Sequence, residues 1–275
     1  MRIIDLARSR RITGNPFELL ADGLTIRLKN GFSVGVTGLA DGDVSGTIYT
    51  AVDDTTFSNL IPNIDDFSTI CTTLLTTLSD KFRDISFNDD IRHFDTINVT
   101  SMTATFFNND TFNQDISNWD VSNVTDFSRM FRDAISFNQN LNVWNTSSAL
   151  TIFQMFRGAS LFNQPLNDWD VSNITNMEGL FSLASAFNQP LNDWDVSSVT
   201  NLDSSFSFAV AFNQPLNNWD VSNVTNMTFT FNNATVFNQD LSGWCVESIP
   251  SEPASFATGS ALTAPNKPNW GAICP

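Results

Sequence analysis

The stretch FNQPLNDWDVSNITNMEGLFSLASA, residues 162–186, decides the fold, because close copies of it follow one another along the chain. The tripeptide Phe-Asn-Gln begins at positions 112, 137, 162, 187, 212 and 237, and the variant Phe-Asn-Asp begins at position 87. Tryptophan keeps the same 25-residue interval from Trp119 to Trp244, and a second phenylalanine column keeps it from Phe106 to Phe231. Such a fixed period indicates an array of repeated structural units.

Each unit has the pattern of one short strand and one short helix. Between Leu166 and Val171 the apolar residues follow the L-x-x-L-x-L spacing of a leucine-rich repeat, with Trp169 in the middle. Alternation through Trp169 and Val171 predicts a strand, and Met177 and Phe181 predict one face of a short helix or 3₁₀ turn. A unit this small cannot bury its own apolar face, so its neighbours must stack on it. We therefore expect an α/β solenoid, a leucine-rich-repeat-like array with capped ends.

The repeats divide the chain into four parts. Residues 87–245 form a seven-unit solenoid, preceded at 51–86 by an N-terminal cap with a degenerate first repeat and followed at 246–275 by a C-terminal cap. Residues 1–50 have a different character, with alternating runs at 24–28 and 32–36 on either side of Asn30-Gly31. That pattern predicts a β-hairpin. We interpret residues 1–50 as a small β region, or as an arm for anchoring or oligomerisation.

Composition argues against several classes of protein. The 275 residues carry 13 Lys+Arg against 29 Asp+Glu, a formal net charge of −16. Binding to nucleic acid requires a basic surface, so nucleic acid is not expected as the main partner. No apolar run approaches the roughly 18–20 residues of a membrane span, and the first residues lack the apolar stretch of a secretory signal peptide.

An asparagine column accompanies the phenylalanines. It consists of Asn88, Asn113, Asn138, Asn163, Asn188, Asn213 and Asn238. We interpret it as an interior ladder whose amides bond backbone groups at a turn, as buried polar groups require. The alternative is an exposed row of asparagines that contacts sugars.

Two further columns of Asp and Asn flank the tryptophans on the exposed side of the expected sheet. They comprise Asn118, Asp120, Asn145, Asp168, Asp170, Asp193, Asp195, Asn218 and Asp220. Like charges repel at the roughly 4.8 Å spacing of adjacent strands, and no Lys or Arg occurs between Arg157 and Lys267. Either each Asp accepts a backbone N–H at the following turn, or Ca²⁺ bridges them; a glycosidase-like carboxylate pair is a third alternative. Because the same residues recur in every unit, we interpret these columns as a candidate binding face and not as an active site.

Catalytic and metal-binding motifs are absent from the sequence, which contains no Gly-rich phosphate loop, Cys-x-x-Cys or His pair. We interpret His93, the only histidine, as a solvated strand residue pointing outward. Cys245 stands in the column that elsewhere holds Asp220, and Cys274 lies in the tail, so in an oxidising environment the two would form a disulfide. Cys71 lies several repeats away and is expected to be a buried free thiol. We expect no enzyme activity and no cofactor.

Units of the form F-N-Q-x-L-x-x-W-D-V-S-N-V-T-N-M-x-x-x-F resemble the BspA-like leucine-rich-repeat surface proteins with mycoplasma-type repeats. The resemblance covers residues 53–275 and includes the ending Leu241-Ser-Gly-Trp-Cys245. It implies a surface adhesin or secreted interaction protein, carries no catalytic residues, and extends to arrays in viral proteins. Residues 1–50 lie outside it.

Together these features predict a non-enzymatic protein of the adhesin or receptor-recognition type. It would present the acidic Asp/Asn columns to a protein or glycan on a cell or virion surface. The alternative is a structural phage virion component, a tail, fibre or capsid-associated subunit that contacts neighbouring subunits through residues 1–50. The expected location is the cell surface, the extracellular space or a virion.

Overall fold

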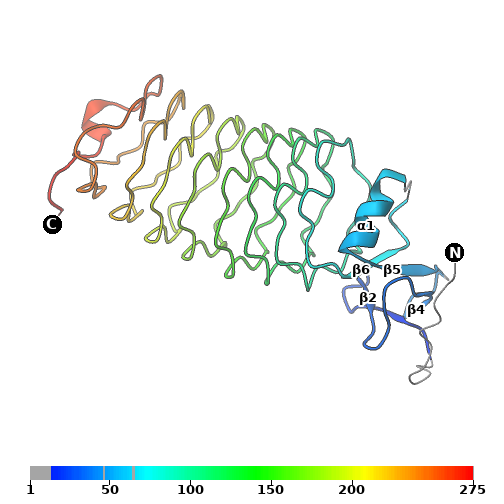
Figure 1. Cartoon of the computed structure of the whole chain (residues 1–275). Helices are drawn as coiled ribbons and strands as arrows, with labels where there is room; N and C mark the ends of the chain where they lie inside the picture. The colour runs from blue at the N-terminus through cyan, green and yellow to red at the C-terminus, as the bar shows by residue number, and fades with distance from the viewer. Residues whose placement is uncertain (1–13, 46, 64–65, 275) are drawn as a thin grey trace.

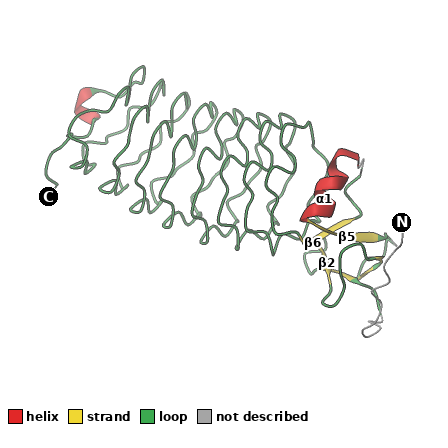
Figure 2. Ribbon diagram, in the orientation of Figure 1, coloured by secondary structure: helices red, strands yellow, loops and turns green. Residues whose placement is uncertain are grey.

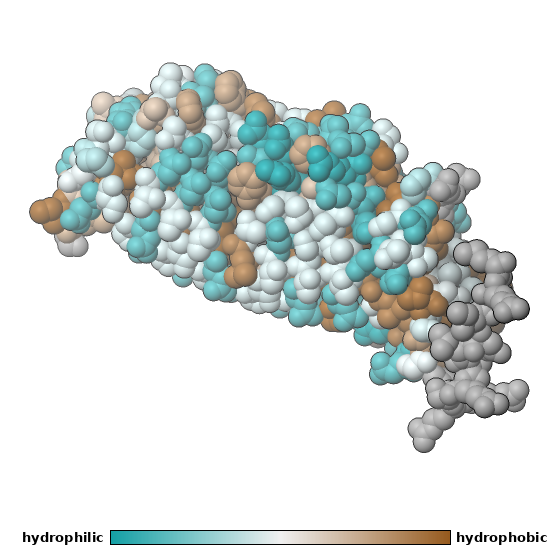
Figure 3. Space-filling model, viewed as in Figure 1, coloured by the Kyte–Doolittle hydropathy of each residue, from teal (hydrophilic) through white to brown (hydrophobic). Residues whose placement is uncertain are grey.

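The computed structural model describes residues 14–45, 47–63 and 66–274. From about residue 76 onward, the chain winds into successive coils that lie side by side along one axis (Figure 1). A region of short strands with one helix sits at the first coil. In the view of Figure 3 the surface of the coils is mostly polar, with small apolar groups along its upper edge. No helix of the described residues is long and apolar enough to cross a membrane.

Adjacent coils are joined by backbone hydrogen bonds between residues 24 positions apart. The N–H of Phe131 donates to the carbonyl of Met155 at 2.9 Å, and the N–H of Phe156 donates to the carbonyl of Leu180 at 3.0 Å. Isolated parallel bridges, such as the one between Asp126 and Thr151, accompany these bonds. Each coil is therefore held by its neighbours along the axis.

The segments 169–171 and 177–181, expected as a strand and a short helix, form neither; they are irregular chain and turns, and Figure 2 draws the coils as loops. Gly179 and Leu183 both have a φ of 62°. A left-handed residue interrupts a helix, which requires consecutive right-handed residues. The same pair of interruptions, four residues apart, recurs in every coil from residue 80 to residue 233. The repeats therefore pack through turns and single bridges.

Aromatic side chains fill the centre of the stack. Phe131 stacks on Phe137 with ring centroids 3.8 Å apart and on Phe156 of the next coil at 5.7 Å. Trp144 and Trp169 stack at 6.4 Å with their planes 5° apart, and all five side chains are buried. Each large aromatic removes roughly 150–250 Å² from water, so this core supplies much of the stabilisation.

The tryptophans also bond the coils together. Every indole N–H from Trp119 to Trp244 donates to a backbone carbonyl 28 residues earlier, in the preceding coil, at 2.8–3.2 Å. A buried indole must find such an acceptor or lose hydrogen-bonding energy. The tryptophan column therefore sets the register of neighbouring coils as well as filling the core.

The asparagine column forms a second cross-coil ladder. Oδ1 of Asn163 accepts the N–H of Asn188 at 2.9 Å and the Nε2 amide of Gln189 at 3.0 Å. The same backbone bond joins every neighbouring pair from Asn88 to Asn238. These side chains are half-buried or exposed, so the expected interior position is wrong. The sequence interpretation also missed the glutamine that completes each rung.

The N-terminal end of the stack is closed by helix α1 (Asp54–Leu60), which continues into the 3₁₀ turn η1 (Ile61–Asn63). The side chain of Asp53 caps α1 by accepting the N–H of Thr56 at 2.8 Å. Phe57 of α1 packs edge-on against Phe82 of the first coil, at 6.1 Å. Oδ1 of Asp54 accepts the N–H of Thr76 at 3.0 Å, which attaches the helix to the start of the coils.

The C-terminal end is closed by the segment around the 3₁₀ turn η2 (Ala264–Asn266). Nδ2 of Asn266 donates to the carbonyl of Asn238 at 3.2 Å, where earlier coils use a glutamine. The N–H of Thr263 donates to Oδ1 of Asn238 at 3.1 Å and so ends the asparagine ladder. Trp270 packs edge-on against Phe256 at 4.9 Å. The asparagine ladder therefore terminates in residues of the tail, and Trp270 covers the last aromatic ring.

Two small sheets form the N-terminal region. The first has the order β2-β1-β4 and the second β3-β5-β6. Their strands are β1 (Phe17–Leu19), β2 (Ile26–Leu28), β3 (Thr37–Gly38), β4 (Ala40–Asp41), β5 (Tyr49–Asp53) and β6 (Ile70–Leu74). β1 pairs with β2 and β3 with β5 in antiparallel fashion, whereas β1–β4 and β5–β6 are parallel.

The predicted hairpin around Asn30-Gly31 is wrong. β2 pairs instead with β1, across a turn in which Oδ1 of Asp22 accepts the N–H groups of Leu24 and Thr25, both at 2.9 Å. Gly23 supplies the left-handed residue of that turn, with a φ of 70°. The segment 32–36 forms no strand.

His93 is half-buried, so its interpretation as a solvated side chain is wrong. Its Nε2 lies 2.9 Å from the carbonyl of Phe67, and its own carbonyl accepts the N–H of Ile26 at 3.2 Å. The histidine is thus enclosed where the N-terminal region meets the first coils. Burial lowers the pKa of His93 below its ordinary value of about 6.5.

Replacing Asn163 by Ala should lower the free energy of unfolding by about 1–3 kcal/mol, because the N–H of Asn188 loses its acceptor. Chemical denaturation measures the change. Asn167→Ala is the control and should change stability by less than about 0.5 kcal/mol, because the exposed Asn167 side chain bonds, among the described residues, only to its neighbour Asp168. Equal losses in both variants would contradict the cross-coil role.

Lowering the pH from 7.5 to 5.5 should lower the Tm of the wild type more than that of His93→Gln. The unfolded chain binds a proton at His93 near pH 6.5 and the folded chain binds it at lower pH, so stability is lost as the pH falls below that value. Glutamine keeps an amide that can donate to the carbonyl of Phe67. Identical pH dependence of the two Tm values would show that burial of His93 does not affect stability.

Candidate functional site

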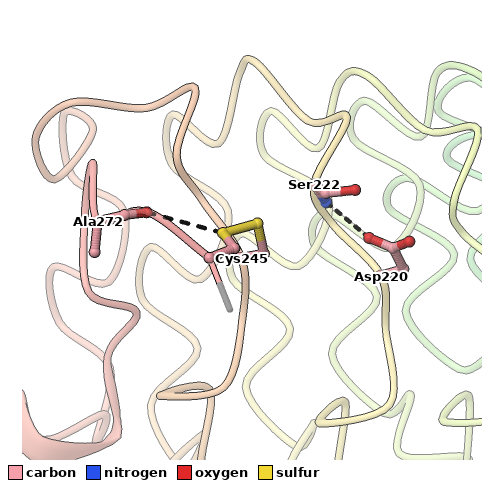
Figure 4. The surroundings of a disulfide bond; sticks show 5 residues. Asp220, Ser222, Cys245 and Ala272 are labelled. Carbon is pink, nitrogen blue, oxygen red and sulfur yellow. Dashed lines mark hydrogen bonds between the residues drawn. A yellow bond between two sulfur atoms is a disulfide. The ribbon is translucent and has the colours of Figure 1, made fainter.

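One column of the candidate face forms a row of identical turns. It consists of Asp120, Asn145, Asp170, Asp195 and Asp220, all exposed. In each, Oδ1 accepts the backbone N–H of the serine two residues further on, at 3.0–3.2 Å. Figure 4 shows this bond between Asp220 and Ser222. Of the two main explanations for the column, hydrogen bonding at the following turn therefore has direct support.

This turn explains how carboxylates at the same position of neighbouring coils can all stay ionised. A carboxylate that accepts an N–H bond is stabilised in its ionised form. The hydroxyl and N–H of Ser197 lower the pKa of Asp195 in this way. In Asp120, Asp170, Asp195 and Asp220, Oδ2 has no hydrogen-bond partner among the described residues. Four of the five coils thus hold one carboxylate oxygen in place and leave the other without a partner, while Asn145 fills the position in the remaining coil.

The column on the other side of the tryptophans is less regular. Nδ2 of Asn118 donates to the carbonyl of Arg92 at 2.7 Å. The N–H of Asp168 donates to Oδ1 of Asn142 at 3.0 Å, and Nδ2 of Asn142 donates back to Oδ2 of Asp168 at 2.6 Å.

Asp193 and Asn218, the last two members of the column that begins with Asn118, also differ from each other. The N–H of Asn218 donates to Oδ1 of Asn192 at 3.0 Å, whereas the side chain of the exposed Asp193 makes no hydrogen bond within the described part of the chain. We name the nine residues of both columns the Asp/Asn face.

The N-terminal end of the Asp/Asn face is covered. Asp95, which lies 25 residues before Asp120, is 2% exposed and forms an ion pair with Arg27, Nε to Oδ2 at 2.8 Å and Nη2 to Oδ1 at 3.1 Å. The hydroxyl of Thr73 donates to the same carboxylate at 2.8 Å. A cleft of about 130 Å³ opens beside this pair and is lined by Asn118 and Asp120, among others.

The sequence interpretation missed this ion pair. The position of Asp95 in the 25-residue column was visible, but its partner lies 68 residues away in a region outside the repeat. The excess of arginine before residue 30 was the only sequence signal for such a contact.

The other end of the face is closed by a disulfide between Cys245 and Cys274, whose Cα atoms are 5.6 Å apart (Figure 4). Cys245 occupies the next position of the same column, 25 residues after Asp220. Cys71 is a free, buried cysteine, and burial raises the pKa of its thiol. The open part of the face therefore runs from Asn118 to Asp220.

The Asp/Asn face offers oxygen atoms that are distributed over successive coils. Among residues 14–45, 47–63 and 66–274, no group of three or more His, Cys, Asp or Glu side chains is placed to hold a metal ion. The carboxylates of Asp120, Asp170, Asp195 and Asp220 bond their own turns, and that of Asp168 accepts the amide of Asn142. The geometry is that of a repeated row of hydrogen-bond acceptors.

Two overlapping parts of the chain, residues 76–182 and 164–270, match the family described as Mycoplasma protein of unknown function, DUF285. The matches together span most of the chain. The chain belongs to this family. DUF285 is a Mycoplasma-type repeat family, and its match covers the coils and the C-terminal cap but not residues 14–75. No curated protein and no solved structure matches the chain.

Replacing Asp170 by Asn should change the free energy of unfolding by less than about 0.5 kcal/mol, because the amide oxygen still accepts the N–H of Ser172. Asn145 already fills this role in its own coil. Asp170→Ala should cost about 0.5–1.5 kcal/mol, since the acceptor is lost. Denaturant titration of both variants measures the difference. An Asn variant as unstable as the Ala variant would mean that charge, and not the turn, matters at this position.

Proposed function

We propose that the chain is a non-enzymatic leucine-rich-repeat interaction protein of the BspA-like type, built as a solenoid. It binds a protein or glycan at a cell or virion surface through the Asp/Asn face. The observation that supports this most directly is the row of exposed Asp side chains, each fixed through Oδ1 and open at Oδ2. Membership of a Mycoplasma-type repeat family agrees with a repeat surface protein.

A fixed acceptor row suits multivalent binding. Because the Asx turns already restrict the side chains, a partner pays less conformational entropy to engage them. Hydroxyl and N–H groups are the complementary donors, and both glycans and proteins supply them in repeated arrays. Contacts made in several coils at once raise a weak affinity per coil to a useful overall affinity.

A second candidate function is that of a structural virion subunit anchored through residues 1–50. Apolar side chains on the N-terminal region favour it: Val44 and Ile48 are 101% and 60% exposed, and Val34 and Leu39 are 41% and 42% exposed. Contiguous exposed apolar surface is typical of sites that contact another chain, and these four side chains all come from residues 34–48. The N-terminal region would then hold the chain in its assembly while the coils project from it.

Replacing Asp168, Asp170, Asp193 and Asp195 together by Asn should weaken binding by at least about tenfold, because four carboxylates are lost while side-chain shape is kept. Purified protein is applied to a glycan array and to a panel of immobilised extracellular matrix proteins, and the Kd of each bound probe is measured. The control replaces Asp110, Asp126, Asp203 and Asp240 by Asn, which changes the net charge equally.

Loss of binding in the Asp/Asn-face variant alone would support the proposal. Equal losses in both variants would point to overall charge, and unchanged binding in both would exclude the Asp/Asn face. The second candidate function expects no binding that depends on this face, so the same measurement separates the two.

A further inference from the structure

A different side of the coils carries side chains that the fold does not require. The two left-handed residues of each coil form two columns along the stack. The first runs through Asp80, Ala104, Arg129, Gln154, Gly179, Ser204 and Phe229, and the second through Asp84, Asn108, Asp133, Gly158, Leu183, Phe208 and Asn233. Glycine, asparagine and aspartate are favoured at positive φ, whereas bulky residues there are outliers.

Three bulky apolar residues nonetheless occupy these columns and remain exposed. Leu183, Phe208 and Phe229 have φ values of 62°, 58° and 56° and are 42%, 44% and 40% exposed. Backbone preference does not explain them, because a bulky residue at positive φ costs free energy, and about two-fifths of each side chain stays exposed. Leu183 and Phe208 hold equivalent positions in adjacent coils, since their N–H groups donate to carbonyls 24 residues further on at 2.8 Å.

Towards the N-terminus, the same side of the coils carries arginines together with the aspartates of the two columns, Asp80, Asp84 and Asp133. The guanidinium of Arg129 lies 4.9 Å from the ring centre of Phe153, and that of Arg132 lies 5.2 Å from the ring centre of Phe107. Asp133 pairs with Arg132 at 3.3 Å, but Arg129 and Arg157 have no carboxylate partner in the described part of the chain. Uncompensated guanidinium groups stand out in a chain with a net charge of −16.

Backbone bonds place these residues at neighbouring positions of successive coils. The N–H of Arg129 donates to the carbonyl of Phe153, and the N–H of Asp133 donates to the carbonyl of Arg157, so arginines lie in adjacent coils. Phe229 lies in the column of Arg129, four coils further on. We name the six residues Arg129, Arg132, Arg157, Leu183, Phe208 and Phe229 the Arg/Phe strip.

We propose that the Arg/Phe strip docks an extended segment of a partner protein. Carboxylates of that segment would lie over the arginines, and aliphatic or aromatic side chains over Leu183, Phe208 and Phe229. Phenylalanine rings of successive coils are 5.7–5.8 Å apart, so the four steps from Arg129 to Phe229 span about 23 Å. An extended chain covers this length in about seven residues.

The strip fits a protein segment better than an anionic glycan. A sulfated glycan would pair with the arginines and could stack a sugar ring on a phenylalanine, but it has no aliphatic group to match Leu183. Arginine and phenylalanine are both enriched in protein interfaces, and close charge pairs at the rim orient a partner. The proposal does not depend on the Asp/Asn face, which is formed by different segments of each coil.

Labelled peptides of about 12 residues test the proposal on the full chain. One carries a block of glutamates followed by leucines, a second has the reverse order, and a third has lysine in place of each glutamate. Fluorescence anisotropy should show binding of at least one acidic peptide and at least tenfold weaker binding of the lysine peptide. Failure of both acidic peptides to bind would overturn the proposal.

Variants separate docking from folding. Phe208→Asn with Phe229→Asn should weaken peptide binding at least tenfold without lowering the Tm, because asparagine is tolerated at positive φ, as Asn233 shows. Arg129→Gln with Arg157→Gln should weaken binding at least tenfold and reduce its dependence on salt. Arg92→Gln with Val143→Ser is the matched control, exposed but outside the strip, and should leave binding unchanged.

Two results would overturn the proposal even if an acidic peptide bound. One is binding that is unchanged in the Phe208 and Phe229 variant. The other is binding of dextran sulfate that is as tight as peptide binding and depends only on the arginines, which would assign the surface to an anionic glycan.

Discussion

Side-chain hydrogen bonds to the backbone of the neighbouring coil are the interactions on which the structure depends. The asparagine amide accepts the N–H of the next coil, and the indole donates to the carbonyl of the preceding one. Because both bonds need the partner residue at one fixed position, they explain why the 25-residue interval tolerates no insertion from residue 87 to residue 237. Aromatic stacking adds burial, but it is these bonds that fix which residues face each other.

Periodicity made the stacked columns predictable, since identical residues at a fixed interval must meet when repeats pack. It could not predict the conformation within a coil, because left-handed residues appear at positions held by leucine, phenylalanine and arginine as well as by glycine. Contacts between the N-terminal region and the coils could not be predicted from the sequence either. Arg27 bonds to Asp95, and the N-terminal region encloses His93. The partners in these contacts lie 26 to 68 residues apart, so no local sequence pattern predicts them.

The candidate face was predictable in position and only partly in role. Asp120, Asp170, Asp195 and Asp220 share one side of the coils, as their spacing implied, and their turns follow from the well-known affinity of Asp for a nearby N–H. The two ends of the candidate face were not predictable. They are set by Asp95, which lies under the N-terminal region, and by Cys245, whose disulfide partner lies in the tail.

Differences between coils and identities between coils have different physical causes. A residue that recurs in every coil, such as Asn163 or Trp169, is explained by the bond it makes to its neighbour. The side chain of a residue that departs from its column, such as Phe208 beside Gly158 and Asn233, makes no such bond, and a bulky side chain at positive φ costs backbone energy. In a chain whose architecture is supplied by repetition, recognition of a particular partner has to come from the positions that do not repeat. The Asp/Asn face and the Arg/Phe strip therefore suit different tasks: a uniform row favours repeated, weak contacts, whereas a graded row of arginines and apolar residues has a direction and can select one partner.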